Sequence, residues 1–228
     1  MVAPLLLLAI QVSGFDVASV KPVNPPAGPH VVSLLIDHGT LRIEAAELRQ
    51  IVGLAYGIQR VRVVGGPGWA DADQFDITAK AASPDATRDE IRGMLQALLA
   101  ERFQMVVHRE TKEVSAYALV LAKGGSKLKA AAAGAKSGLT DTVGPNGERR
   151  TVLVASHLRV LVNMLANTLG SPVVDKTGLD GLYDYTVEWP EAGSSLFASV
   201  DQLGLKLEAK KEPVEVLVID RAERPSAN

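Results

Sequence analysis

The string Asp175-Lys176-Thr177-Gly178 contains residue types that could do chemistry. In P-type ATPases the same four letters hold an aspartate that attacks a phosphoryl group, and Lys-Thr-Gly also recurs in penicillin-binding enzymes. The ATPase motif continues with Thr, whereas Leu179 follows here, and the Ser-Asp-Asn element of the penicillin-binding site is absent from the sequence. Glycine permits positive φ, and Asp and Thr side chains bond to the local backbone. The string therefore predicts a turn and not a catalytic site.

A second candidate is a metal site formed by His108 and Glu110. These residues lie two apart on a predicted strand, so they share a face and could bind a metal ion. The alternative, an exposed strand end that enters a charged turn, is favoured because the other histidines have no ligand spacing: His30, His38 and His157. The chain has no cysteine, which excludes disulfides, thiolate zinc sites and cysteine nucleophiles. We expect no bound metal and no cofactor.

Trp69 is the aromatic candidate. It follows Pro67-Gly68 and could form a binding platform, but burial across the base of the first half is favoured because Trp carries a large apolar surface. Trp69, Tyr56 and His108 together are the candidate ligand or partner surface. No P-loop, complete dinucleotide fingerprint or Gly-x-Ser-x-Gly motif is present, so no catalytic or cofactor-binding residue is predicted.

Composition narrows the class of protein. The 228 residues are 47% hydrophobic and 22% charged, with a net charge of -2. Such a chain can bury one large core or two small ones, which argues against wholesale disorder. The near-neutral balance argues against a nucleic-acid partner.

Residues 1–14 contain a short apolar run, PLLLLAI, from Pro4 to Ile10. The run is too short to span a bilayer as a helix, so no transmembrane span is predicted. Its length suits the apolar centre of a secretory signal peptide, but no Lys or Arg precedes it, so the signal is truncated or the run is a buried strand. A signal would place the protein outside the cytoplasm, in the periplasm or secreted.

Amphipathic spacing predicts helices near 45–56, over Ile91 to Leu99, near 158–169, and a fourth that starts at Ser194 or Ser195. Thr87 and Glu90 form a capping box at the start of the second helix. Gly57 and Gly170 are placed to end the first and third helices in the left-handed conformation.

The order helix, short strand, strand, helix, hairpin occurs twice. Two β-prone runs on either side of Glu110 to Glu113 predict the first hairpin, and the run from Leu203 to Asp220 predicts the second. FDIT at 75–78 and YDYT at 183–186 open corresponding strands. The fold class expected is α+β, with two tandem similar units, each with two helices packed on a mainly antiparallel sheet.

The expected organisation is a signal-like segment at 1–14, a first α+β unit at 15–122, an Ala/Gly/Lys-rich linker at 123–147 and a second α+β unit at 148–228. The linker is favoured over a basic binding patch because no aromatic residue is interleaved in it for stacking. If the two units correspond, Asp76 and Asp184 must fall on equivalent strands.

The stretches FDVASVKP, GGPGW, LQALLAERFQMVVHRETKEVSAYALVLAKGG, VVDKTGLDGLYDYTVEW and PVEVLVID resemble an uncharacterised secreted family. This domain-of-unknown-function family is expanded in soil acidobacteria, especially Solibacter-like bacteria. The resemblance covers Phe15 to Pro225 and implies an extracytoplasmic protein without a known reaction. Each half is also similar to the short N-terminal domain of secretins and TonB-dependent receptors, which docks protein partners.

Two functions follow as hypotheses. The first is an extracytoplasmic binding or docking module without an active site, whose partner is a protein or peptide of the cell envelope. The alternative is a hydrolase or other enzyme whose site is assembled between the two halves.

Overall fold

The structure, a computed structural model, describes residues 14–23, 33–144, 149–189 and 196–225. The signal-like segment at 1–13 and the residues expected to start the fourth helix, Ser194 and Ser195, lie outside the described residues. The chain divides into two compact units, one of residues 1–110 and 216–228 and one of residues 111–215.

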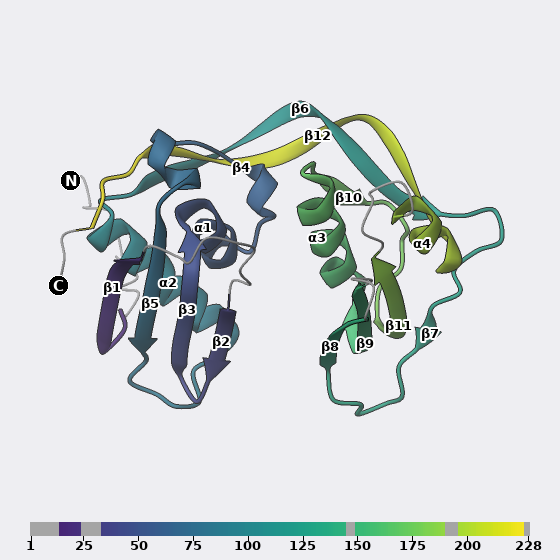
Figure 1. Cartoon of the computed structure of the whole chain (residues 1–228), viewed down its shortest axis with the longest axis horizontal. Coiled ribbons are helices and arrows are strands. Elements are labelled where there is room, and N and C mark those ends of the chain that lie inside the picture. Colours follow the sequence, from purple (N-terminus) through teal and green to yellow (C-terminus); the bar gives the residue numbers. More distant parts are fainter. Residues whose placement is uncertain (1–13, 24–32, 145–148, 190–195, 226–228) are drawn as a thin grey trace, which may run out of the picture. The chain divides into compact units, whose positions relative to one another are not determined.

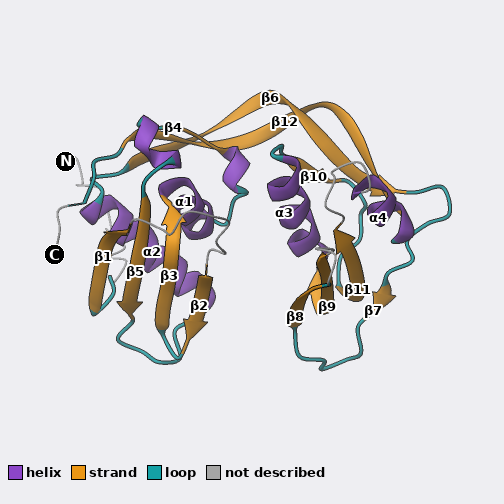
Figure 2. Ribbon diagram, viewed as in Figure 1, coloured by secondary structure: helices purple, strands orange, loops and turns teal. Residues whose placement is uncertain are grey.

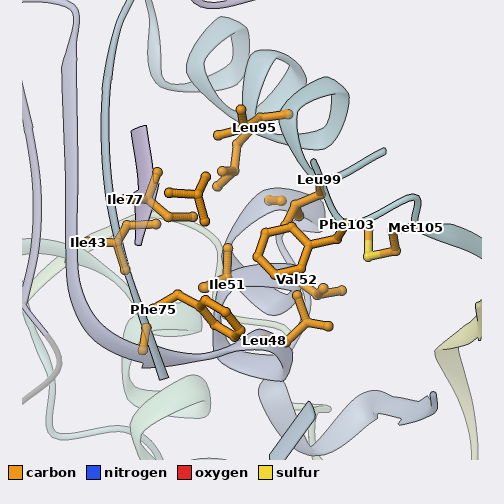
Figure 3. Close-up of a cluster of buried hydrophobic side chains, with 14 of the residues drawn as sticks. Ile43, Leu48, Ile51, Val52, Phe75, Ile77, Leu95, Leu99, Phe103 and Met105 are labelled. Atoms are coloured by element: carbon orange, nitrogen blue, oxygen red, sulfur yellow. The ribbon is translucent and has the colours of Figure 1, made fainter. Parts of the chain in front are cut away.

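The first unit is built on an antiparallel sheet with the strand order β1-β5-β3-β2 (Figure 1). Its strands are β1 (Val17–Val23), β2 (Ser33–Asp37), β3 (Thr40–Glu47) and β5 (Gln74–Lys80). The helices α1 (Leu48–Tyr56) and α2 (Arg88–Arg102) belong to this unit. Buried side chains from both helices meet those of β3 and β5 in one apolar cluster (Figure 3).

The predicted start of α2 and the predicted end of α1 are confirmed, whereas α1 begins at Leu48 and not near Ala45, which lies on β3. The hydroxyl of Thr87 accepts a hydrogen bond from the Glu90 N–H, and the Glu90 carboxylate accepts one from the Thr87 N–H, so the capping box is confirmed. Gly57 ends α1 with φ +65°. The inward spacing of α2 is also confirmed, because Ile91, Leu95 and Leu99 are fully buried.

The glycine turn of the first unit connects β4 (Val63–Gly65) to the short 3-10 helix η2 (Gly68–Asp71). β4 pairs in parallel with Leu217–Ile219 of β12. Gly65 and Gly66 have positive φ, and a Cβ on Gly65 would lie 2.8 Å from the Ile219 carbonyl oxygen. Glycine is required here because the turn passes so close to β12.

The second unit has an antiparallel sheet with the order β7-β11-β9-β8 (Figure 2). Its strands are β7 (Lys129–Ala130), β8 (Gly138–Val143), β9 (Arg149–His157) and β11 (Leu182–Trp189). The unit also contains α3 (Leu158–Leu169), α4 (Leu196–Gln202) and β10 (Val173–Asp175), which pairs in parallel with Tyr117–Leu119 of β6. Gly170 ends α3 with φ +61°, as predicted.

The two predicted hairpins are wrong. Residues Val106–Leu121 form one continuous strand, β6, and residues Leu205–Arg221 form another, β12. Instead of turning back at Glu110 to Glu113, the chain leaves the first unit at Glu110 and enters the second at Thr111. β12 passes in the opposite sense, from the second unit at Glu215 to the first at Val216.

The expected α+β fold, with two tandem units that each carry two helices on a sheet, is therefore wrong. The part of the chain that the structure describes contains four α-helices and twelve strands, and the strands form three sheets. The third sheet has the order β10-β6-β12-β4, and its two central strands are the long strands that the sequence suggested would fold back. The first unit is not contiguous, because residues 216–228 complete it.

The segment 123–147, expected to be a linker, contributes two strands to the second unit. β7 pairs with β11, and β8 pairs with β9 over six residue pairs. Its first residues are also fixed by backbone hydrogen bonds, such as the one from the Lys127 N–H to the Leu203 oxygen at 2.9 Å. Its alanines and glycines gave no apolar period because these short strands bury little of their own surface.

Candidate docking surface

The motif Asp175-Lys176-Thr177-Gly178 forms a turn directly after β10. Both the N–H and the hydroxyl of Thr177 donate to Oδ1 of Asp175, at 2.9 and 2.7 Å. The Thr177 hydroxyl in turn accepts the N–H of Leu179 at 3.1 Å, and Gly178 has φ +70°. The Asp175 carboxylate thus accepts hydrogen bonds from within its own turn, as Asp does in turns of this kind.

Lys176 has an electrostatic partner within the same unit. Its Nζ lies 3.5 Å from the carboxylate of Glu212 on β12, and the Nζ of Lys210 lies 3.0 Å from it. The hydrogen bond from Lys210 holds the pKa of Glu212 below its ordinary value, with smaller contributions from Lys176. Lys176 therefore neutralises a carboxylate whose side chain is only 9% exposed.

His108 is paired with a carboxylate of the neighbouring long strand. Its Nδ1 lies 2.9 Å from both carboxylate oxygens of Asp220, and its side chain is about half exposed. Within the described ranges, no group of three or more His, Asp and Glu side chains could hold a metal ion. Glu110, which the sequence paired with His108 as a candidate metal ligand, is the last residue of β6 that belongs to the first unit.

Trp69 lies on η2, with its indole ring partly buried. The ring is stacked near Phe103 with centroids 6.4 Å apart, and it meets Phe75 edge-on at 6.1 Å. The guanidinium of Arg224 sits 5.3 Å from the indole centroid, and its Nε donates to Asp73 at 2.6 Å. Arg224 of the same chain thus already lies over the indole ring that the sequence raised as a possible binding platform.

Tyr56, the last residue of α1, is also partly buried. Burial raises the pKa of its hydroxyl, and the nearby charge of Arg109 opposes that rise. No hydrogen bond or ring contact among the described residues joins Tyr56, Trp69 and His108 to one another. All three belong to the first unit.

The second unit offers a different surface, the β8 edge, which we define as the strand Gly138–Val143 at the open side of its sheet. All six residues are exposed. Leu139 is 52% exposed and Val143 is 72% exposed, and the two side chains lie on the same face of the sheet. Exposed apolar side chains that gather at one place mark interaction sites more often than scattered ones do.

Other edges are shorter or blocked. β1 carries Lys21 and Pro22, and both residue types discourage pairing with another strand. β7 has only two residues. β2 has five residues, and β4 and β10 at the edges of the third sheet have three each. The β8 edge has neither Lys nor Pro, so its free N–H and C=O groups can accept a further strand.

Three side chains of the β8 edge lie on the buried face of its sheet. Leu139, Asp141 and Val143 lie opposite residues of β9 that share this face: Leu153, Thr151 and Arg149. Leu153 and Thr151 are 1% and 0% exposed. The buried face thus continues outward to β8, but there its apolar side chains are not covered.

Asp141 is held in place at the centre of the β8 edge. Its carboxylate accepts a hydrogen bond from the hydroxyl of Thr151 and one from Arg149 at 2.6 Å. The Thr151 hydroxyl in turn accepts the indole N–H of Trp189 at 2.8 Å. Burial alone would raise the pKa of Asp141, but the bonds from Thr151 and Arg149 outweigh it and hold that pKa below its ordinary value.

Sequence reasoning missed the β8 edge. The segment Gly138–Val143 reads GLTDTV, with only two large apolar residues, and it follows an Ala/Gly/Lys-rich stretch. The available signal was the alternation of Leu139, Asp141 and Val143 with two threonines, a residue type enriched in strands.

No helix among the described residues has the length and apolar character needed to cross a membrane. The model of the family described as "Protein of unknown function (DUF3738)" matches residues 49–222. No curated protein matches the chain. No solved structure matches it either.

Proposed function

The chain belongs to the DUF3738 family, and we propose that it is an extracytoplasmic binding module that docks a partner protein of the cell envelope along the β8 edge. The observation that carries the proposal is that all six edge residues are exposed and that Leu139 and Val143 are not covered. An edge strand binds a partner's extended backbone through main-chain hydrogen bonds, while side-chain positions on alternate faces add specificity.

A binding role is consistent with the other candidate residues. Asp175 is engaged by Thr177, Lys176 by Glu212, and His108 by Asp220. Each of these groups has a partner that accounts for its position without a substrate.

The extracytoplasmic location is supported by the apolar run from Pro4 to Ile10 and by the resemblance to a secreted acidobacterial family. A fusion of the full chain to a reporter enzyme that is active only where its disulfides form would test it. We expect activity in the producing cell. A reporter that is active only when an unrelated signal peptide is added would contradict the location.

Site-specific photo-crosslinking tests the docking edge. A photoreactive amino acid replaces Thr140 on β8, and a matched control replaces Val17, which is 67% exposed on the Pro-containing edge strand β1. In the organism that makes the protein, we expect one discrete cross-linked envelope protein from position 140 and none from position 17. Thr140→Pro should abolish capture at a second β8 position, Thr142, because it places proline in the pairing strand. Equal capture from positions 17 and 140 would refute the proposal.

A further inference from the structure

The charge at the centre of the β8 edge restricts what can pair there. The buried face of the edge reads apolar, acidic, apolar, from Leu139 through Asp141 to Val143. This pattern is the same in both directions. An added strand therefore meets it whether it runs parallel or antiparallel to β8.

Asp141 cannot turn away from an added strand, because Thr151 and Arg149 hold its carboxylate. Thr151 is itself fixed by the indole of Trp189, which is 7% exposed. Side chains directly opposite one another on paired strands lie close together, and like charges in that position are destabilising. A partner residue opposite Asp141 is therefore next to a carboxylate in a fixed position, and the ion pair with Arg149 offsets only part of the charge of that carboxylate.

The same geometry disfavours a second copy of the chain as occupant. If two β8 edges paired antiparallel about their centres, Leu139 would face Val143, which is favourable. That register would also place Asp141 directly opposite the Asp141 of the second copy, and like charges in that position are destabilising.

We propose, resting on the docking function proposed above, that Asp141 selects the partner: an extended segment with apolar residues that face Leu139 and Val143 and a non-acidic residue between them that faces Asp141. Lys, Arg, Ser or Thr in the central position can donate to the carboxylate, whereas Asp or Glu meets its charge. The apolar residues on either side cover the exposed Leu139 and Val143.

The test uses the full-length protein and three β-hairpin peptides with an Asn-Gly turn, because a preformed strand avoids the cost of ordering on binding. Their outer strand reads Val-Thr-X-Thr-Val, where X is Lys, Thr or Glu. Binding is followed by the backbone amide signals of 138–143 in NMR titrations. We expect the Lys and Thr peptides to bind, and the Glu peptide to bind about fivefold more weakly than the Lys peptide.

Asp141→Asn keeps the shape of the side chain and removes its charge, and we expect it to bring the three affinities to within about twofold of one another. High salt should reduce the same difference in the unmutated chain, which provides a readout that does not depend on a variant. If the Glu peptide binds the unmutated chain as tightly as the others, the selection by Asp141 is refuted while the docking edge stands. If no peptide shifts the amides of 138–143, the docking edge itself is refuted.

Discussion

The backbone N–H of Ala155 donates to Oδ1 of Asp184 at 2.8 Å. The same contact joins Ala45 to Asp76, also at 2.8 Å. Both alanines have positive φ, 43° and 52°, and both lie at an irregularity of strand register just before a helix. Asp184 lies on β11 and Asp76 on β5, so an aspartate on the neighbouring strand fixes the same irregularity in each unit. This local correspondence does not restore the tandem architecture, because β6 and β12 are shared between the units.

Removal of the acceptor should destabilise the protein. We expect Asp184→Ala and Asp76→Ala each to lower the free energy of unfolding by about 1–2 kcal/mol, because a partly buried N–H loses its partner. Asp184→Asn and Asp76→Asn are the matched controls, since the amide oxygen can still accept the bond. Urea unfolding provides the measurement. Equal losses for the Ala and Asn variants would show that the hydrogen bond is not what these carboxylates contribute.

Gly178 tests the interpretation of the Asp175-Lys176-Thr177-Gly178 motif as a turn. A Cβ at Gly178 would meet nothing within 4 Å, so Gly178→Ala should cost about 1 kcal/mol from its φ of +70° alone. Gly68 has equally open surroundings but no positive φ, so Gly68→Ala should be near neutral. Thermal unfolding of the two variants compares them. A phosphoenzyme trapped on Asp175 after incubation with ATP would overturn the turn interpretation.

Gly204 tests whether the segment after β6 is packed. A Cβ on Gly204 would clash with the Gly125 backbone, lie 2.8 Å from the Lys127 nitrogen and sit at φ +72°. We expect Gly204→Ala to cost more than about 3 kcal/mol, since neither backbone can move cheaply. Gly170, at φ +61° with open surroundings, isolates the conformational part, about 1 kcal/mol. Similar losses in chemical denaturation for the two variants would mean that this segment does not pack against Gly204.

Asp141 should make stability depend on pH in the acid range. Its pKa in the folded chain lies below the ordinary 3.8, so its contribution is present above that pH and is lost as the pH falls through the lower folded value. The unmutated chain should therefore be more stable than Asp141→Asn near neutral pH, and the difference should shrink below about pH 4. Chemical denaturation at a series of pH values measures it. A difference that grows with acidity would reverse the sign and contradict the bonds from Thr151 and Arg149.

The helices could be predicted because their signals are local. Thr87 and Glu90 lie three residues apart in the sequence, and Gly57 and Gly170 directly follow amphipathic runs. The long strands could not be predicted in the same way. Residues 111–113 of β6 and 209–211 of β12 are exposed and mostly charged, so the middle of each strand carries no alternation of buried and exposed residues. A charged stretch between two β-prone runs is then indistinguishable from a turn.

The candidate residues showed the same division between local and distant signals. The turn at Asp175 could be predicted because the hydrogen bonds of its Asp and Thr side chains join residues two apart. The pairing of His108 with Asp220 spans 112 positions and left no trace in the sequence. The β8 edge was missed because its exposure is set by its place in the sheet order and not by its own residues.

The central claim is that a partner strand adds to the β8 edge, and amide hydrogen exchange of residues 138–143 tests it most directly. On an edge strand, alternate N–H groups point away from the sheet, and only a strand added there can bond them. With the cross-linked envelope partner purified and added to the full-length protein, exchange should slow at alternate residues of Gly138–Val143 while β1 is unaffected. A partner that binds without slowing exchange at any residue of β8 would contradict the account.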